Sequence, residues 1–195
     1  MKRRTVIFGA LALSMTLFTA CNKQEKKIQE TTAAVSSTAA AVAGKEASFS
    51  NFTAITLDGE TVTQDIFQDH DLTMINIWAT FCGPCLSEMP DLGEIHEEYK
   101  DKGFQVVGIV IDVLNNDGSL SQTQLDTARE IVEKTEADYM HLLPSNDLIK
   151  AKLSQVSAVP ETIFVDSEGN LVGEAYMGAK TKEDWKGIID EYLEK

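Results

Sequence analysis

The sequence has few of the residues from which metal centres and disulfide-stabilised folds are built. It contains three cysteines and three histidines in 195 residues. A structural zinc site needs four ligands, usually a second CxxC or a pair of histidines, and the histidines here are scattered, so zinc is disfavoured. Three cysteines also exclude a fold held by several disulfides, and a domain of this length buries enough surface to fold without them.

Basic residues and long apolar segments are scarce as well. The chain has 17 lysines and arginines against 31 aspartates and glutamates, a net charge of -14, so nucleic acid is an unsuitable ligand. The apolar run at residues 5–20 is shorter than the about 20 residues that span a bilayer. With 43% hydrophobic and 25% charged residues, the composition is that of a soluble globular domain.

The N-terminus has the pattern of an export signal. Basic residues at positions 2–4 precede the apolar run 5–20, which leads into the segment LFTAC. Phe18, the third residue before the cysteine, is too bulky for ordinary signal peptidase, but the segment resembles a bacterial lipobox, whose cysteine carries lipid. We therefore expect a signal peptide at residues 1–20 and lipid attachment at Cys21. Simple secretion and an uncleaved anchor are the alternatives.

A polar segment separates this signal from the folded part of the chain. Residues 22–46 are rich in Ala, Ser, Thr and charge, with no aromatic residue, which is typical of a flexible tether. As a flexible coil this segment spans roughly 25 to 30 Å; a short helix in its Ala-rich part is the alternative. We expect the lipid-attachment cysteine and tether over residues 21–46 and one folded domain over residues 47–195.

Alternating strand and helix patterns fill that domain. An Asp-Gly turn at 58–59 joins two short β patterns and predicts a hairpin. The apolar runs 72–78 and 104–112 predict buried strands, and apolar residues at helical spacing predict a helix over 84–102 between them. An amphipathic helix, a short strand, a helical turn, a strand-turn-strand unit and a terminal helix follow, at 120–137, 139–143, 146–154, 162–178 and 181–195. This order predicts an α/β fold with a mixed central sheet and helices on both faces.

Two cysteines, Cys82 and Cys85, form a CGPC motif between the predicted strand 72–78 and the helix after it. A purely structural disulfide across so short a loop would restrict little of the unfolded chain. Redox exchange suits the placement better, because a thiol at a helix N-terminus lies over unpaired N–H groups that stabilise a thiolate. We expect Cys82 to attack and Cys85, one turn further on, to resolve the mixed disulfide. Binding of Cu(I) by the pair is the rival interpretation, although the motif itself offers no Met or His.

Two separated segments, INIWATFCGPCLSEMP at 75–90 and AVPETIFVDSEGNLV at 158–172, resemble the membrane-tethered thioredoxin-like proteins of the TlpA and ResA type. The resemblance implies a thioredoxin fold with an N-terminal β-hairpin and an insertion, at about 114–137, before the second half. It further implies that Cys82 and Cys85 are the redox pair and that Pro160 is a cis-proline beside them.

Other residues near the motif gain roles from the same resemblance. It implies that Glu88 helps to handle protons; the alternative is an ordinary surface residue of the helix. Trp78 and Phe81 are candidates for substrate contact or for packing. The backbone of Val159 is expected to pair with an extended substrate segment. Glu161, where the family has a smaller polar residue, departs from the pattern and leaves substrate preference open.

These observations predict an extracytoplasmic thiol:disulfide oxidoreductase, lipid-anchored on the bacterial cell membrane and acting as a reductant without cofactor or metal. Because an oxidising compartment supplies no electrons for reduction, the resemblance implies a membrane thiol transporter of the DsbD or CcdA type as donor. The acceptor is expected to be an apocytochrome c, a methionine sulfoxide reductase or another exported disulfide protein. A Cu(I)-binding metallochaperone lipoprotein is the alternative function.

Overall fold

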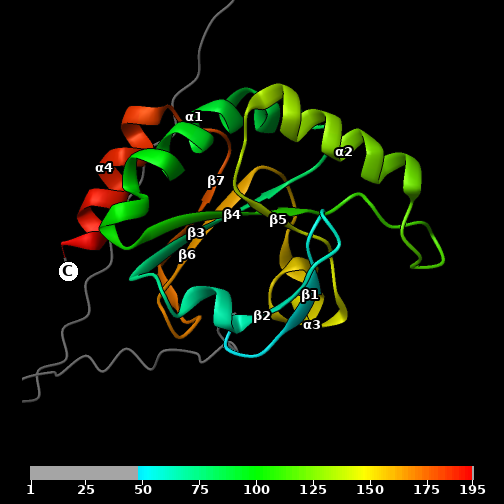
Figure 1. Ribbon diagram of the computed structural model, residues 1–195, viewed down its shortest axis with the longest axis horizontal. Helices are drawn as coiled ribbons and strands as arrows, with labels where there is room; N and C mark the ends of the chain where they lie inside the picture. Colours follow the sequence, from blue (N-terminus) through cyan, green and yellow to red (C-terminus); the bar gives the residue numbers. More distant parts are fainter. Residues whose placement is uncertain (1–47, 195) are drawn as a thin grey trace, which may run out of the picture. The chain divides into compact units, whose positions relative to one another are not determined.

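The computed structural model describes residues 48–194 (Figure 1). The predicted signal peptide, Cys21 and the tether therefore lie outside the described residues. Within residues 48–194, no helix combines the length and the apolar character needed to span a membrane.

The centre of the described domain is a mixed five-stranded sheet in the order β5-β4-β3-β6-β7. Its strands are β3 (Leu72–Trp78), β4 (Phe104–Val110), β5 (Met140–Leu142), β6 (Glu161–Val165) and β7 (Leu171–Met177). The first three run parallel, whereas β6 is antiparallel to both β3 and β7. This topology confirms the predicted mixed sheet.

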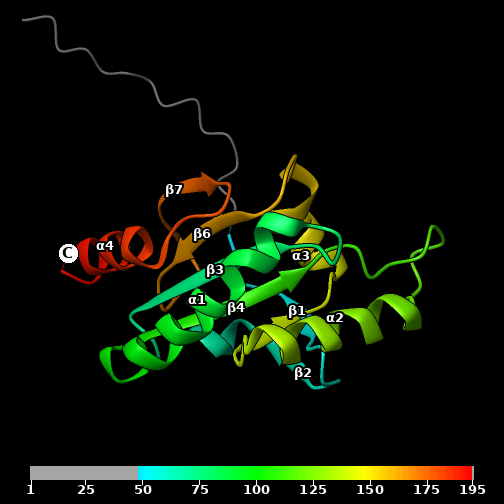
Figure 2. The ribbon, with the colours of Figure 1, turned by 90° about the horizontal axis from the view of Figure 1, so that it is seen from above.

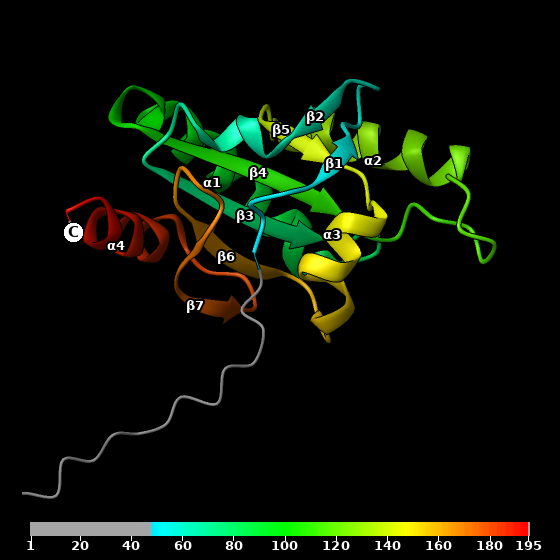
Figure 3. The ribbon, with the colours of Figure 1, turned by 90° about the horizontal axis from the view of Figure 1, so that it is seen from below.

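Strands β3 and β4 form the middle of the sheet because their sequences are almost continuously apolar. Every residue of both strands is buried, as expected where helices or loops cover both faces. They pair in parallel from Leu72 opposite Phe104 to Trp78 opposite Val110, so both end at the same edge. Figure 3 shows the two arrows pointing to the edge beside which α3 (Asn146–Ala151) lies.

The two faces of the sheet are covered differently. Helices α1 (Gly83–Tyr99), α2 (Gln122–Thr135) and α4 (Lys182–Leu193) lie on one face, with α1 between the other two (Figures 1 and 2). The other face is covered by α3 and three N-terminal elements, which are β1 (Thr53–Ile55), β2 (Thr61–Thr63) and the 3-10 helix η1 (Gln64–Phe67). The short 3-10 turns η2 (Lys100–Lys102) and η3 (Leu153–Gln155) follow α1 and α3.

Each helix begins where the sequence supplies a cap. Ser121, Ser145 and Thr181 accept hydrogen bonds from backbone N–H groups at the starts of α2, α3 and α4. The cap at Thr181 confirms the predicted start of the terminal helix. Helix α1 differs, because its N-cap residue is Cys82.

Candidate active site

The two cysteines lie where β3 gives way to α1. Cys82 caps α1, and its sulfur accepts a hydrogen bond from the Cys85 backbone N–H at 3.2 Å. Pro84, in the first turn, has the fixed φ that favours a helix start. Cys82 and Cys85 form a disulfide, with Cys82 5% exposed and Cys85 fully buried. An incoming sulfur therefore finds Cys82 first, at the positive end of the helix.

The Val159–Pro160 peptide bond is cis, which confirms the expectation for Pro160. Pro160 immediately precedes β6, whose first residue, Glu161, pairs with Ile77 near the end of β3. The proline is buried, and the half-buried side chain of Val159 packs against both hydrophobic cores. The sheet thus brings Pro160 to the edge from which the Cys82 loop emerges.

The aromatic residues Trp78 and Phe81 have opposite environments. Trp78 is fully buried, and its indole N–H donates to Nδ1 of His141 at 3.2 Å. This burial corrects the suggestion that Trp78 contacts substrate, since it is the last residue of a buried strand and packs in the core. Phe81, beside Cys82, is 77% exposed and remains a candidate substrate contact.

Glu88 is 2% exposed, so the interpretation as a surface helix residue is wrong. Its Oε1 accepts a hydrogen bond from the Asn76 side chain at 3.0 Å. Its Oε2 accepts from the Lys180 backbone N–H at 3.2 Å and from the Trp185 indole N–H at 3.4 Å. Burial raises the pKa of Glu88, and hydrogen bonds to its ionised form partly offset that rise.

Asn76 connects this carboxylate to the sheet. Its side-chain amide donates both to Glu88 and to the Thr162 hydroxyl, the latter at 3.1 Å. The Asn76 Oδ1 atom is buried and has no hydrogen-bond partner within residues 48–194. A neutral amide therefore orients Glu88 at this point on β3 without adding a second charge.

A cluster that the sequence did not reveal anchors the loop before Cys82. The Asp112 carboxylate accepts hydrogen bonds from the Thr80 backbone N–H at 3.0 Å and from the Thr80 hydroxyl at 2.5 Å. The Gln124 side chain of α2 donates to the same carboxylate at 3.3 Å. The one available signal was positional, because Thr80 and Asp112 both follow the carboxyl ends of neighbouring parallel strands.

The sequence gave no role to His141, which forms a hydrogen bond with Trp78 in the core. Because an indole N–H can only donate, Nδ1 of His141 accepts, and Nε2 carries the proton and donates to the Ala137 carbonyl at 3.1 Å. Burial lowers the pKa of His141 to about 4, so the ring is neutral. The facing residue on β4 is Gly108, where a Cβ atom would collide with the imidazole ring.

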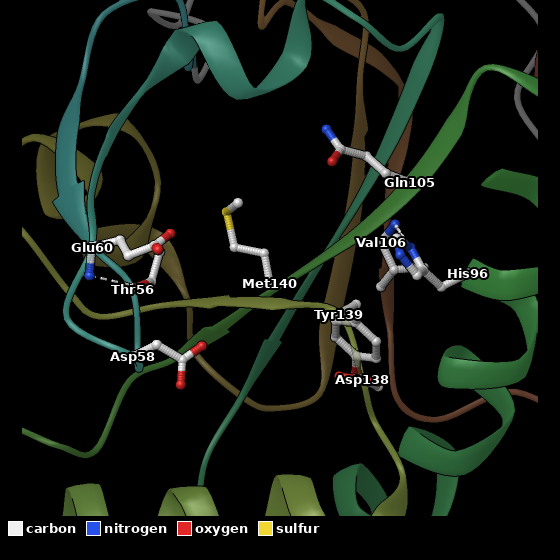
Figure 4. Close-up of a pocket in the computed structure, with 9 residues that line it drawn as sticks. All are labelled: Thr56, Asp58, Glu60, His96, Gln105, Val106, Asp138, Tyr139 and Met140. Atoms are coloured by element: carbon white, nitrogen blue, oxygen red, sulfur yellow. Dashed lines mark hydrogen bonds between the residues drawn. The ribbon is translucent and has the colours of Figure 1, made fainter.

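A separate pocket of about 390 Å³ lies at the other end of the strands (Figure 4). Gln105 and Val106 line it from the start of β4, whereas the cysteines follow the end of β3. Asp58 and Glu60 enter from the hairpin turn. Nowhere in residues 48–194 do three or more His, Cys, Asp or Glu side chains gather as metal ligands would. Because its lining residues lie at the start of β4 and in the hairpin turn, this pocket is separate from the cysteine site.

The fold and site together define a class: a thioredoxin-like domain with a CxxC disulfide at the start of a helix and a cis-proline at the neighbouring strand. The Redoxin family model matches residues 41–189, and the chain belongs to that family. The chain is 29% identical over 136 residues to the thiol-disulfide oxidoreductase ResA of Oceanobacillus iheyensis, covering 68% of this chain and 65% of that protein. With ResA of Bacillus cereus, identity is 27%, covering 76% of this chain and 77% of the relative.

Solved structures show the same fold. A thiol:disulfide interchange protein of the thioredoxin family from Chlorobium tepidum superposes with a TM-score of 0.63 at 23% identity, covering 76% of this chain and 97% of that one. A DsbF homologue from Corynebacterium diphtheriae gives 0.59 at 25% identity, covering 76% and 88%. With the Cys82–Cys85 disulfide, the family and the ResA relatives define this chain as a thiol-disulfide oxidoreductase of the ResA type.

Proposed function

We propose that this protein reduces disulfides in exported proteins through the Cys82–Cys85 dithiol. The observation that carries the proposal is the unequal placement of the two sulfurs. Cys82 caps α1 and is 5% exposed, while Cys85 lies fully buried one turn inside. The helix N-terminus favours a thiolate at Cys82, and the buried thiol reaches only a sulfur already bound there.

The reaction moves two electrons from the dithiol to the substrate. The Cys82 thiolate attacks one sulfur of the substrate disulfide, and the other substrate sulfur leaves as a thiolate that takes up a proton. Cys85 then loses its proton and attacks the Cys82 sulfur, which releases the second substrate thiolate. This step leaves Cys82 and Cys85 joined in a disulfide, which is the oxidised form that the structure describes.

Glu88 is the group proposed to handle the protons of this sequence. It lies one turn beyond Cys85 on α1, and burial raises the pKa of its carboxyl toward the range in which thiols exchange protons. When ionised, the carboxylate opposes the formation of a nearby thiolate. On the substrate side, Phe81 and the backbone of Val159, next to the cis-proline Pro160, are proposed to contact the bound segment.

The cellular setting is also a proposal, supported by the N-terminal pattern and by the oxidising chemistry of extracytoplasmic compartments. Lipid on Cys21 would hold the enzyme at the outer side of the cytoplasmic membrane. Reduction there requires electrons from the cytosol, so a DsbD- or CcdA-type membrane thiol transporter is the proposed donor. The proposed acceptor is an apocytochrome c, a methionine sulfoxide reductase or another exported disulfide protein.

Mixed-disulfide trapping tests this function. The Cys85→Ser variant should stop after the first attack and keep its substrate covalently attached, whereas Cys82→Ser should trap almost nothing. Mass spectrometry of the trapped adduct then identifies the acceptor. Equal trapping by both variants would contradict the assigned roles. No trapping by either, together with tight Cu(I) binding by the reduced wild-type protein, would replace the proposal with a metallochaperone function.

A further inference from the structure

The carboxylate of Glu88 is held from two sides. Asn76 of β3 holds Oε1. Both donors to Oε2 come from one short segment, residues 180–185, at the junction of β7 and α4. They are the Lys180 backbone N–H and the Trp185 indole N–H. Residues 180–185 therefore supply two of the three hydrogen-bond donors that the Glu88 carboxylate has within residues 48–194, although they lie more than ninety residues further along the chain (sequence separations 92 and 97).

The Trp185 ring is fixed in the orientation that makes this hydrogen bond. It is fully buried on the inner side of α4. The rings of Phe164 and Tyr176 pack against it edge-on, with centroids 6.3 Å and 5.7 Å away. Because the indole cannot turn without disturbing both rings, its N–H stays directed at the carboxylate.

We propose that Trp185 is a positioning residue for the redox reaction: its indole N–H stabilises the ionised Glu88 carboxylate and holds it toward α4. This inference rests on the proposed proton-handling role of Glu88. A donor that bonds the charged form of an acid favours that form, so losing the indole N–H makes Glu88 harder to ionise. With a smaller fraction of Glu88 ionised, the reduced Cys82–Cys85 pair would form its thiolate against less electrostatic repulsion from the Glu88 carboxylate.

The loop between β7 and α4 also connects the surroundings of the carboxylate to the cis-proline and to solvent. The Gly178 N–H donates to the Pro160 carbonyl at 2.9 Å. Ser87 and Glu88 on one side and residues 179–181 and Asp184 on the other line a cavity of about 320 Å³. A proton can thus reach the otherwise buried carboxylate beside α4.

Several charged or titratable groups face Glu88 and share in its titration. Asp91, on the same helix, opposes ionisation of Glu88. Tyr139, which follows α2, interacts electrostatically with the carboxylate. On the α4 side, Asp184 lines the cavity, and the Lys180 ammonium lies 5.7 Å from the centroid of the Trp185 ring. The facing groups from β3 and β6, Asn76 and Thr162, are uncharged.

The experiment removes the indole N–H by Trp185→Phe, which also makes the buried ring smaller. In the oxidised protein, the Glu88 carboxyl carbon is titrated by ¹³C NMR, and its pKa should rise by about half a unit or more. In the reduced protein, the pH profile of Cys82 alkylation should move toward that of Glu88→Gln. Tyr99→Phe is the matched control, because it removes a different α1–α4 hydrogen bond, from Tyr99 to Asp190 at 2.8 Å.

A double variant separates positioning from packing. In a Glu88→Gln background, Trp185→Phe should leave the alkylation profile unchanged. An unmoved Glu88 titration in Trp185→Phe, or a profile shift that persists without the carboxylate, overturns the inference. Where Trp185→Phe does not fold, benzothienylalanine at position 185, a ring of the same shape without the N–H, takes its place. The NMR titration does not depend on turnover, so failure of Cys85→Ser to trap substrate would count against the proposed function alone.

Discussion

At the scale of single residues, burial changes what a charged side chain does. Glu161 follows Pro160 directly, and its carboxylate forms an ion pair with Lys152, with both side chains almost buried. Removing one partner of such a pair leaves an unpaired buried charge, which typically costs about 3 to 5 kcal/mol. The pair thus ties the segment after α3 to the first residue of β6, a role that the sequence could not assign to Glu161.

His141 should make the folded protein sensitive to mild acid. Its folded pKa is about 4, against 6.5 for an ordinary histidine, because burial disfavours the charged ring. As pH falls below about 6.5, the unfolded chain binds a proton that the folded protein does not, so stability is lost down to about pH 4. From pH 7 to pH 5 this contributes a loss of about 2 kcal/mol in the free energy of unfolding.

Urea unfolding of the wild type and His141→Gln at both pH values measures this contribution. The variant should be less stable at pH 7 but lose about 2 kcal/mol less than the wild type on acidification. Other titrating groups, such as His96, affect both proteins alike and cancel in the comparison. Equal losses in the two proteins would show that His141 is not the acid-sensitive group.

Sequence patterns located the reacting residues but not their surroundings. The CGPC spacing identified Cys82 and Cys85, and the Val-Pro-Glu segment identified Pro160. Glu88 remained ambiguous because its partners lie 12, 92 and 97 residues away and meet it only once the sheet and α4 are in place. Trp78 and Phe81 also could not be told apart, since both are aromatic and only the fold buries one of them.

At the scale of elements, hydrophobic periodicity predicted the helices and strands well. The run 72–78 became β3 with the predicted bounds, and helical spacing over 84–102 became α1 followed by η2. The elements that cover the sheet face opposite α1, α2 and α4 were harder to predict. It consists of a hairpin, η1 and the short α3, whose few residues carry too little periodicity to show which face they cover.

The loop that carries Cys82 should depend on Asp112. In Asp112→Ala, the Thr80 N–H and hydroxyl lose their shared acceptor, while the end of β4 keeps its backbone pairing through the Ile111 N–H and the Trp78 carbonyl. Since a hydrogen bond to a charged group contributes about 1.5 to 3 kcal/mol, we expect a stability loss of about 2 kcal/mol. The Thr80 amide should lose hydrogen-exchange protection, and disulfide exchange should slow by about tenfold or less.

Asp126→Ala is the matched control for this prediction. Asp126 is an exposed carboxylate of α2 whose hydrogen bonds within residues 48–194 go only to side chains of its own helix, Gln122 and Arg129. The Asp126→Ala substitution should leave the hydrogen-exchange protection of the Thr80 amide and the rate of disulfide exchange unchanged. Normal Thr80 protection in Asp112→Ala would show that the loop is held by packing alone.

At the scale of the whole molecule, the described domain begins at the end opposite the disulfide. The Phe49 N–H donates to the Gly169 carbonyl at 2.9 Å, in the turn after β6, and the Phe49 ring is fully buried. Pro160 lies at the other end of β6, beside the cysteine site. The first described residues and the disulfide therefore lie at opposite ends of β6.

The last prediction concerns that anchor, which rests on the lipobox-like segment ending at Cys21. The wild-type protein expressed in its bacterial host should sediment with membranes and begin at a lipid-modified Cys21, whereas Cys21→Ala should enter the soluble fraction. A Cys82→Ser, Cys85→Ser variant serves as the control and should remain with the membrane, because its N-terminus is intact. Wild-type protein that is soluble and carries an unmodified N-terminus would refute the anchor, while the redox proposal, which rests on residues 48–194, would stand.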